Sequence, residues 1–245
     1  MSHHRTQAIE AYGWTAVPRS VTALLAQSQA TGPAPYIPIT SLPIPTTPLS
    51  TAVNAYAKKE LPIETYNHSL RVYSYGLAIL QHAFPTWSTP TFTETYFLTS
   101  LLHDIGTTST NIHATLLSFE FYGGILTLNL LKSLSAPTEQ AESVAEAVIR
   151  HQDLGETGTL TRIGGLVQLA TIFDNMGKGV ELVAWETVES VVGAWPRRGW
   201  SGCFAETIRR ENGLKPWAHT THLGEEDFPN GVLGNELMMP FDNLD

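Results

Sequence analysis

The chain has little cysteine, little positive charge and no long apolar run. Its single cysteine, Cys203, allows no disulfide within the 245 residues, which fits a reducing compartment. The net charge of −9 argues against nucleic acid or an anionic membrane surface as a partner. No apolar run approaches transmembrane length, and the N-terminus lacks the apolar core of a signal peptide. These absences predict a soluble cytoplasmic protein, with entry into the nucleus left open.

What the sequence does contain predicts an all-α fold in a single domain. Hydrophobic residues make up 42% of the chain and charged residues 15%, the composition of a globular protein with a substantial core. Apolar residues recur at spacings of three and four, the period of an α-helix, and no alternating stretch of useful length suggests a strand. Helices are expected at about 20–29, 49–59, 63–84, 93–104, 115–131, 137–151, 160–175, 185–194 and 202–210.

The two ends of the chain differ in composition from the middle. Prolines recur from Gly32 to Pro48, which predicts an extended strap lying over the helical body. Beyond Pro216, Gly, Pro and Asn dominate, and we expect a tail on the surface or on a partner subunit. This divides the chain into an N-terminal arm and strap (1–48), a helical metal-binding domain (49–222) and a C-terminal tail (223–245). The apolar strap and the six tryptophans favour a homo-oligomer.

A His-Asp pair ends one apolar run, in Leu101-Leu102-His103-Asp104-Ile105-Gly106. Neighbouring helical residues point about 100° apart, so both can reach one ion only where the helix ends or bends. Gly106 is expected to end it, because glycine tolerates the left-handed conformation that stops helices. Imidazole and carboxylate suit a borderline divalent metal such as zinc. Taken alone, such a pair could equally lie on a solvated surface.

Two further positions strengthen the case for a metal site. His68 lies on an amphipathic segment upstream, and Asp174 lies on another downstream, where a carboxylate is costly to bury unless it is paired or binds a metal. Each residue alone could be satisfied by ordinary hydrogen bonds. In this order, His68, His103, Asp104 and Asp174 resemble the ligand set of the HD-domain superfamily of metal-dependent hydrolases. The resemblance implies a helical fold that binds a divalent metal through these four side chains.

Longer segments resemble fungal cyanamide hydratases, whereas the stretch from Thr31 to Pro48 and the tail after Leu223 depart from that pattern. The resemblance implies a hydro-lyase that adds water to cyanamide, a small neutral nitrile, and gives urea. It implies one metal ion per chain, expected to be zinc, with iron or manganese as alternatives. The segments that carry the resemblance are 12–18, 64–72, 101–107, 118–125, 145–153, 168–175 and 215–222.

The reaction implied by this resemblance needs two proton transfers. A metal lowers the pKa of its bound water, and attack of the resulting hydroxide on the nitrile carbon builds negative charge on nitrogen. Asp104 is expected to take the water proton while remaining a ligand, and His151 to hold substrate and deliver a proton to nitrogen, or the two roles are exchanged. His151 could instead bind a second metal, or only offset a helix dipole.

Other candidate residues keep two interpretations each. Arg71 could bind an anionic substrate or pair with a nearby carboxylate. Glu120 could orient a ligand histidine or be solvated. His219 and His222 have metal-like spacing, but a surface pair explains them as well. Cys203 is interpreted as a small buried residue.

Two other functions compete with a hydratase. A phosphohydrolase acting on nucleotides or another small phosphate ester needs several cations around the phosphate, and only Arg71 and Arg150 lie near the motifs. A non-enzymatic binding module would keep the fold without chemistry. An intact ligand set argues against that module, because buried metal ligands are costly to keep together without a metal.

Overall fold

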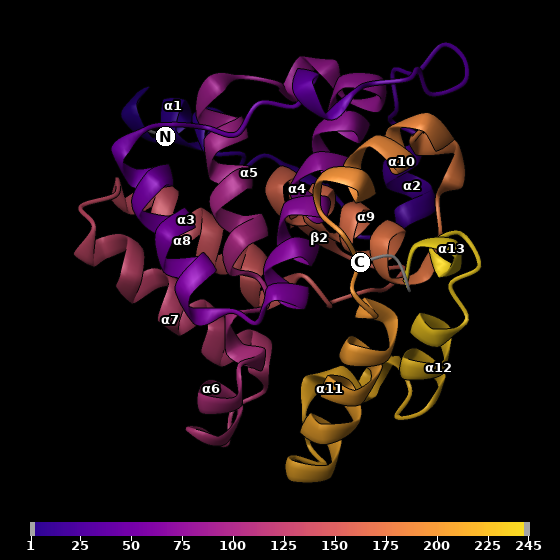
Figure 1. The fold of residues 1–245 in the computed structure, drawn as a ribbon. Coiled ribbons are helices and arrows are strands. Elements are labelled where there is room, and N and C mark those ends of the chain that lie inside the picture. The colour runs from indigo at the N-terminus through magenta and orange to yellow at the C-terminus, as the bar shows by residue number, and fades with distance from the viewer. Residues whose placement is uncertain (1–2, 243–245) are drawn as a thin grey trace.

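The structure is a computed structural model that describes residues 3–242, so the first two residues of the predicted arm and the last three of the predicted tail lie outside it. It confirms an all-α, single-domain fold (Figure 1). In this part of the chain, no helix has both the length and the apolar character needed to cross a membrane. The helices are α1 His3–Ala11, α2 Val21–Leu25, α3 Pro48–Glu60, α4 Ile63–Ala83, α5 Pro90–Leu102, α6 Ser109–His113, α7 Phe119–Ser133, α8 Thr138–Arg150, α9 Arg162–Met176, α10 Trp185–Ala194, α11 Trp200–Leu214, α12 Asp227–Leu233 and α13 Met239–Asp242.

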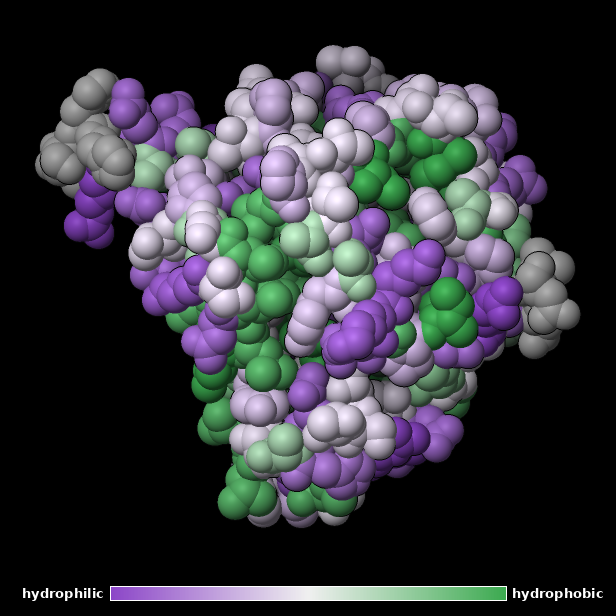
Figure 2. Space-filling model, turned by 60° about the vertical axis from the view of Figure 1, so that its left-hand side comes forward, coloured by the Kyte–Doolittle hydropathy of each residue, from purple (hydrophilic) through white to green (hydrophobic). Residues whose placement is uncertain are grey.

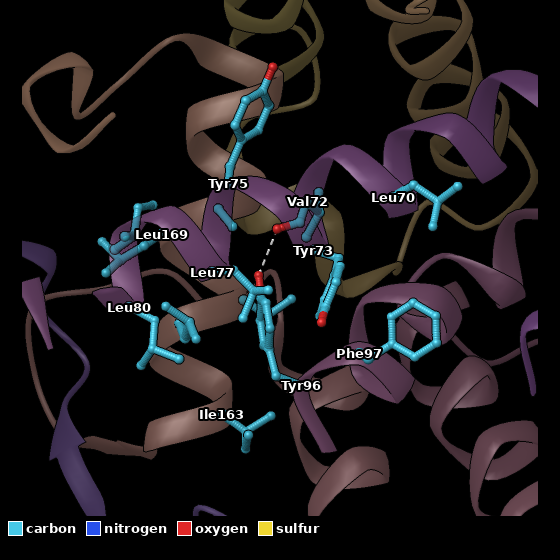
Figure 3. Packing of buried hydrophobic residues seen from close by; sticks show 14 of the residues in the cluster. Leu70, Val72, Tyr73, Tyr75, Leu77, Leu80, Tyr96, Phe97, Ile163 and Leu169 are labelled. Atoms are coloured by element: carbon cyan, nitrogen blue, oxygen red, sulfur yellow. Dashed lines mark hydrogen bonds between the residues drawn. The ribbon is translucent and has the colours of Figure 1, made fainter. Parts of the chain in front are cut away.

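Helix α4 is the centre of the core. Almost every side chain from Thr65 to Leu80 is buried, and α4 packs against α5 and α9 in the middle of the molecule (Figure 1). Figure 3 shows apolar side chains of these three helices meeting, with the Tyr96 hydroxyl donating a hydrogen bond of 2.8 Å to the Val72 carbonyl. This packing fixes the axes of the helices that carry the candidate site.

Threonines determine where three of these helices begin. The side chains of Thr47, Thr89 and Thr161 accept hydrogen bonds from backbone N–H groups in the first turns of α3, α5 and α9. Such caps contribute about 1 kcal/mol each, because they satisfy donors that the helix itself leaves free.

The His-Asp pair follows a helix end, as its sequence required, but the predicted role of Gly106 is wrong. Helix α5 ends at Leu102, and His103 and Asp104 lead into a short 3-10 turn, Ile105–Thr107. Gly106 does not have a positive φ. A Cβ atom there would lie 2.0 Å from the Phe119 carbonyl oxygen at the start of α7. Glycine is needed at this position for close packing of two backbones.

The segment between α2 and α3 is extended apart from one 3-10 turn, Ile39–Ser41. The backbone N–H groups of Ile37 and Ile39 donate hydrogen bonds of 2.7 and 3.0 Å to the hydroxyls of Thr187 and Ser190 on α10. The domain borders at residues 48 and 222 stay a prediction. One unexpected feature is a small antiparallel sheet that joins β1, Ala16–Pro18, to β2, Thr159–Thr161, just before α9.

The C-terminal region differs from the surface tail that we expected. After α11, a 3-10 segment, His219–Leu223, leads to α12, which packs against α11 and α9 (Figure 1). Phe228 and Val232 of α12 and Phe241 of α13 are buried. Apolar residues spaced four apart form short helices here despite the surrounding Gly, Pro and Asn, so this region is part of the folded body.

Candidate metal centre

Three side chains from two neighbouring helices converge in the core. His68 lies on α4, and His103 and Asp104 follow the end of α5; none is more than 1% exposed. Nε2 of His68 lies 3.1 Å from Nε2 of His103, and Oδ2 of Asp104 lies 3.6 and 3.2 Å from these two nitrogens. Ligand atoms about 2.0–2.1 Å from a tetrahedral zinc ion are about 3.3 Å apart. The three atoms are therefore spaced as ligands of one ion.

The hydrogen bonds of the two histidines direct lone pairs toward this point. His103 Nδ1 lies 2.8 Å from the Ser100 carbonyl oxygen, which can only accept, so Nδ1 carries the proton and Nε2 a lone pair. His68 Nδ1 likewise donates to Asp174, at 2.6 Å. Both oxygens of Asp104 are buried without a hydrogen-bond partner among the described residues. Facing lone pairs and an unsatisfied carboxylate are unfavourable by themselves and fit a bound divalent cation.

The protonation states of two of the three side chains suit a metal, which needs deprotonated ligands. Burial alone would raise the pKa of Asp104, but the adjacent His103 and then His68 hold that pKa below its usual range. Burial lowers the pKa of His68 to about 4, against the opposing effect of Asp174. At neutral pH Asp104 is therefore ionised and His68 is neutral. Burial opposes a charge on His103, but the neighbouring Asp104 raises the pKa of His103, so a metal ion would displace a proton from this ring.

Asp174, on α9, lies on the other side of the His68 ring and is not brought together with the other three residues. Its Oδ2 accepts from His68 Nδ1, and both its oxygens accept from Arg71, at 3.0 to 3.2 Å. Arg197 Nη1 donates to Oδ1 at 2.8 Å. All four groups are fully buried. Burial opposes ionisation of Asp174, but the two guanidinium charges hold its pKa below its usual range. Arg71 is thus the partner of a carboxylate; a ligand role for Asp174 stays a prediction.

His151 lies at the C-terminal end of α8, beside the three converging side chains. Its Nδ1 donates to the Val148 carbonyl at 2.7 Å, so Nε2 carries a lone pair, which has no described partner. Nε2 lies 3.7 Å from Asp104 Oδ1, and the ring is edge-on to those of His103 and Phe119. Burial, with the neighbouring His103, lowers the pKa of His151 to about 4. It is therefore a neutral base.

The group opens onto a small cavity of about 20 Å³. That is about the room that one or two water molecules need. Neither Lys nor Arg is among its described lining residues. Helices α9, α11 and α12 and the segment before α12 supply most of the wall, so the unexpected C-terminal helices help to enclose the site. The lining residues are His103, Asp104, His151, Gln152, Leu154, Thr171, Ile172, Asn175, Met176, Phe204, Leu223 and Phe228.

Sequence reasoning missed three residues that hold this site in place. Trp200 stacks on the His68 ring, with centroids 4.1 Å apart and planes 15° from parallel, and donates from Nε1 to Asn175 Oδ1 at 2.7 Å. Arg197 is the second guanidinium on Asp174. Residues 196–199, Pro-Arg-Arg-Gly, have the composition of a solvated turn, so nothing in the sequence indicated that Arg197 is buried. Asn175 was visible only as the neighbour of Asp174.

The other candidates lie outside the group. Glu120 is fully buried, and its Oε1 pairs with Nδ1 of the half-buried His219 at 2.8 Å rather than with a ligand histidine. This hydrogen bond, followed by the charge of Glu120, raises the pKa of His219. His222 Nδ1 donates to the His219 carbonyl. Cys203 is only partly buried, unlike the buried residue that we expected, and this partial burial raises the pKa of its thiol. Among residues 3–242, the only cluster spaced as metal ligands is that of His68, His103 and Asp104.

These features define an α-helical protein with a buried candidate site for a divalent metal beside a small cavity. No family model matches the chain. Two relatives in Saccharomyces cerevisiae, the cyanamide hydratases DDI2 and DDI3, are each 40% identical to it over 225 residues, which cover 91% of this chain and 96% of each relative. The chain belongs to the fungal cyanamide hydratase family. This confirms the predicted family and the predicted hydro-lyase; membership of the HD-domain superfamily stays a prediction.

Proposed function

We propose that the protein adds water to the nitrile of cyanamide and forms urea, using one zinc ion held by His68, His103 and Asp104. The relatives named cyanamide hydratase support the reaction. The observation that carries the proposal is the cavity of about 20 Å³, which adjoins this group and has no Lys or Arg in its described lining. Such a cavity suits a neutral substrate of a few heavy atoms.

The donor set supports zinc, since two imidazoles and one carboxylate are among its usual ligands; iron and manganese are the alternatives. A divalent metal at this position supplies Lewis acidity that makes water nucleophilic near neutral pH.

Two roles are compatible with Asp174. It could complete the ligand set after a small shift, or it could orient His68 and raise the basicity of that ligand, as carboxylates beside metal-binding histidines do. Its five hydrogen-bond contacts to His68, Arg71 and Arg197 support the orienting role.

His151 moves the proton in this proposal. Its Nε2 is an unpartnered lone pair with a depressed pKa, so His151 enters the reaction as a base. It takes a proton from the attacking water and passes that proton to the nitrile nitrogen, and the isourea that results becomes urea by tautomerisation. Asp104, whose pKa lies below its usual range, is a weak base and stays with the metal. His151 thus carries out both proton transfers, whereas the first of them was predicted for Asp104.

A phosphate substrate finds no support in the surroundings of the cavity. Arg71 is committed to Asp174 and to the carbonyl oxygens of Trp195 and Pro196. Arg150 pairs with Asp153 at 2.8 Å. A phosphate needs several cations that converge on it, and neither guanidinium lines the cavity.

The direct test incubates purified, metal-replete protein with cyanamide and measures urea. We expect about one divalent metal per chain by elemental analysis, urea formation that stops with a chelator, and recovery when zinc is restored. Nucleotides and a generic phosphate ester, tested in parallel, should release no phosphate. Phosphate release without urea would overturn the proposed reaction, and urea formation unaffected by metal removal would overturn the role of the metal.

We also propose that the protein forms a homo-oligomer through an apolar patch made of Leu116, Leu117, Phe121 and Trp217. Leu116 is 75% exposed and Trp217 61% exposed, and Trp217 Nε1 donates to the backbone carbonyl of Leu116, so the indole lies beside the segment that carries Leu116 and Leu117. On the face shown in Figure 2, hydrophobic side chains gather in a band down one side. Exposed apolar patches of this kind commonly mark association surfaces.

Replacing the two most exposed members of the patch tests the assembly. The double variant Leu116→Ser/Trp217→Ser should shift the mass measured by light scattering from that of an oligomer to about 27 kDa, close to the chain mass of 26.8 kDa. Tyr36→Ser, which removes a side chain 56% exposed elsewhere, serves as the control and should leave the mass unchanged. A monomeric wild-type protein at high concentration would contradict the proposal.

A further inference from the structure

Asn175 is a buried amide held in one orientation. It is 5% exposed, follows Asp174 on α9 and lines the cavity beside His103 and His151. Its Oδ1 accepts a hydrogen bond of 2.7 Å from Trp200 Nε1. An indole N–H can only donate, so the amide atom that faces it must be oxygen. The NH₂ group is therefore the end of the amide that does not face Trp200, on a side chain that lines the cavity.

Packing holds Trp200 in place, and this keeps the Asn175 amide in one orientation. Its ring is 1% exposed and stacks on the rings of both His68 and Phe204. Rotating the Asn175 amide by 180° would place two N–H groups against each other in a buried site and would cost a hydrogen bond. The structure therefore presents a preorganised donor to the same small space that the unpartnered His151 Nε2 adjoins.

The hydration of a nitrile needs such a donor. As the water oxygen forms its bond to carbon and loses a proton, one π pair of the C≡N bond becomes a lone pair on nitrogen. Negative charge collects on that nitrogen until it takes up the proton, and the neutral product is isourea. Donors aimed at an atom where charge develops stabilise the transition state more than the ground state.

We infer that the Asn175 side-chain NH₂ donates a hydrogen bond to the nitrile nitrogen of the substrate, and that Trp200 is the positioning residue that holds this amide. The inference rests on the proposed function and adds a catalytic residue to it. His151 then needs only to move the proton, while Asn175 stabilises the charge that precedes its arrival. None of the other candidate residues was assigned to stabilise the negative charge on the nitrile nitrogen.

Asn175→Asp is the main test, because a carboxylate still accepts from Trp200 but has no NH₂ group. We expect kcat for urea formation to fall about 10²–10³-fold, the loss typical of one such donor, with KM changed only a few-fold and with metal content and melting temperature retained. Asn230→Asp is the matched control: this exposed amide on α12 accepts from Arg209, which a carboxylate also can, so kcat should stay unchanged.

A double-mutant cycle tests Trp200. Trp200→Phe keeps a stacking ring but frees the amide, and kcat should fall by less than in Asn175→Asp. In an Asn175→Ala background, Trp200→Phe should lower kcat no further, because it acts through the amide. Wild-type kcat in Asn175→Asp or in Trp200→Phe, or a loss confined to KM, overturns the inference. Absence of urea formation by the wild-type protein is a different result, since it overturns the proposed function before any variant is compared.

Discussion

His151→Ala is expected to retain the metal and the fold while cyanamide turnover falls about 10²–10⁴-fold. The imidazole is the unpartnered neutral base of the cavity, with Nε2 3.7 Å from Asp104 Oδ1, and no other described lining side chain outside the candidate ligands has a buried nitrogen or oxygen without a partner. Elemental analysis, melting temperature and kcat, measured on one preparation, separate this role from the alternatives.

Each alternative for His151 gives a different pattern. If it binds a second metal, the metal content falls together with kcat. If it only offsets the dipole of α8, kcat survives and the unfolding free energy falls by about 1 kcal/mol. His113→Ala is the control: this exposed histidine makes the same kind of bond, from Nδ1 to a carbonyl in its own helix, and should change nothing. A His151→Ala variant with near-wild-type kcat would remove His151 from the mechanism.

The parts of the site that could be predicted from the sequence are those set by local pattern. The spacing of apolar residues located the helices, and the adjacent His103 and Asp104 required a helix end, which the structure has at Leu102. His68 could be recognised because it lies at a regular position on an amphipathic helix. Each of these follows from residues within a few turns of one another.

The parts that could not be predicted depend on contacts between distant segments. Asp174 and Arg197 lie 23 residues apart, and nothing near Arg197 indicates that a turn will bury its guanidinium. The orientation of Asn175 depends on Trp200, 25 residues later. Phe228 lines the cavity because α12 packs against the body. The sequence of α12 contains Pro, Asn and Gly and did not predict a helix. Gly106 was predicted to end a helix, a local role. Glycine is instead needed there because the backbone of Phe119 approaches from another helix.

Asp174→Asn is expected to cause the largest loss of stability among the site variants, about 3–5 kcal/mol in unfolding free energy measured by urea denaturation. The carboxylate neutralises two guanidinium groups that are fully buried, at 3.0 Å from Arg71 Nη2 and 2.8 Å from Arg197 Nη1. An amide keeps the shape but leaves Arg71 without a counterion, and it leaves Arg197 with Asp242 alone, at 2.7 Å. Glu226→Gln, which breaks an exposed ion pair with Arg209, is the control and should change stability little.

The metal content of Asp174→Asn decides between the two roles of this carboxylate. If Asp174 only orients His68, metal affinity should fall about 10–100-fold, and zinc in excess should restore both the stoichiometry and much of the turnover. If Asp174 is a ligand, excess zinc should restore neither, because one donor of a tetrahedral set is missing. The hydrogen bonds that already occupy both of its oxygens favour the first result. Asp104→Asn provides the reference for loss of a ligand, since the unpartnered Oδ2 of Asp104 lies 3.6 and 3.2 Å from the Nε2 atoms of His68 and His103.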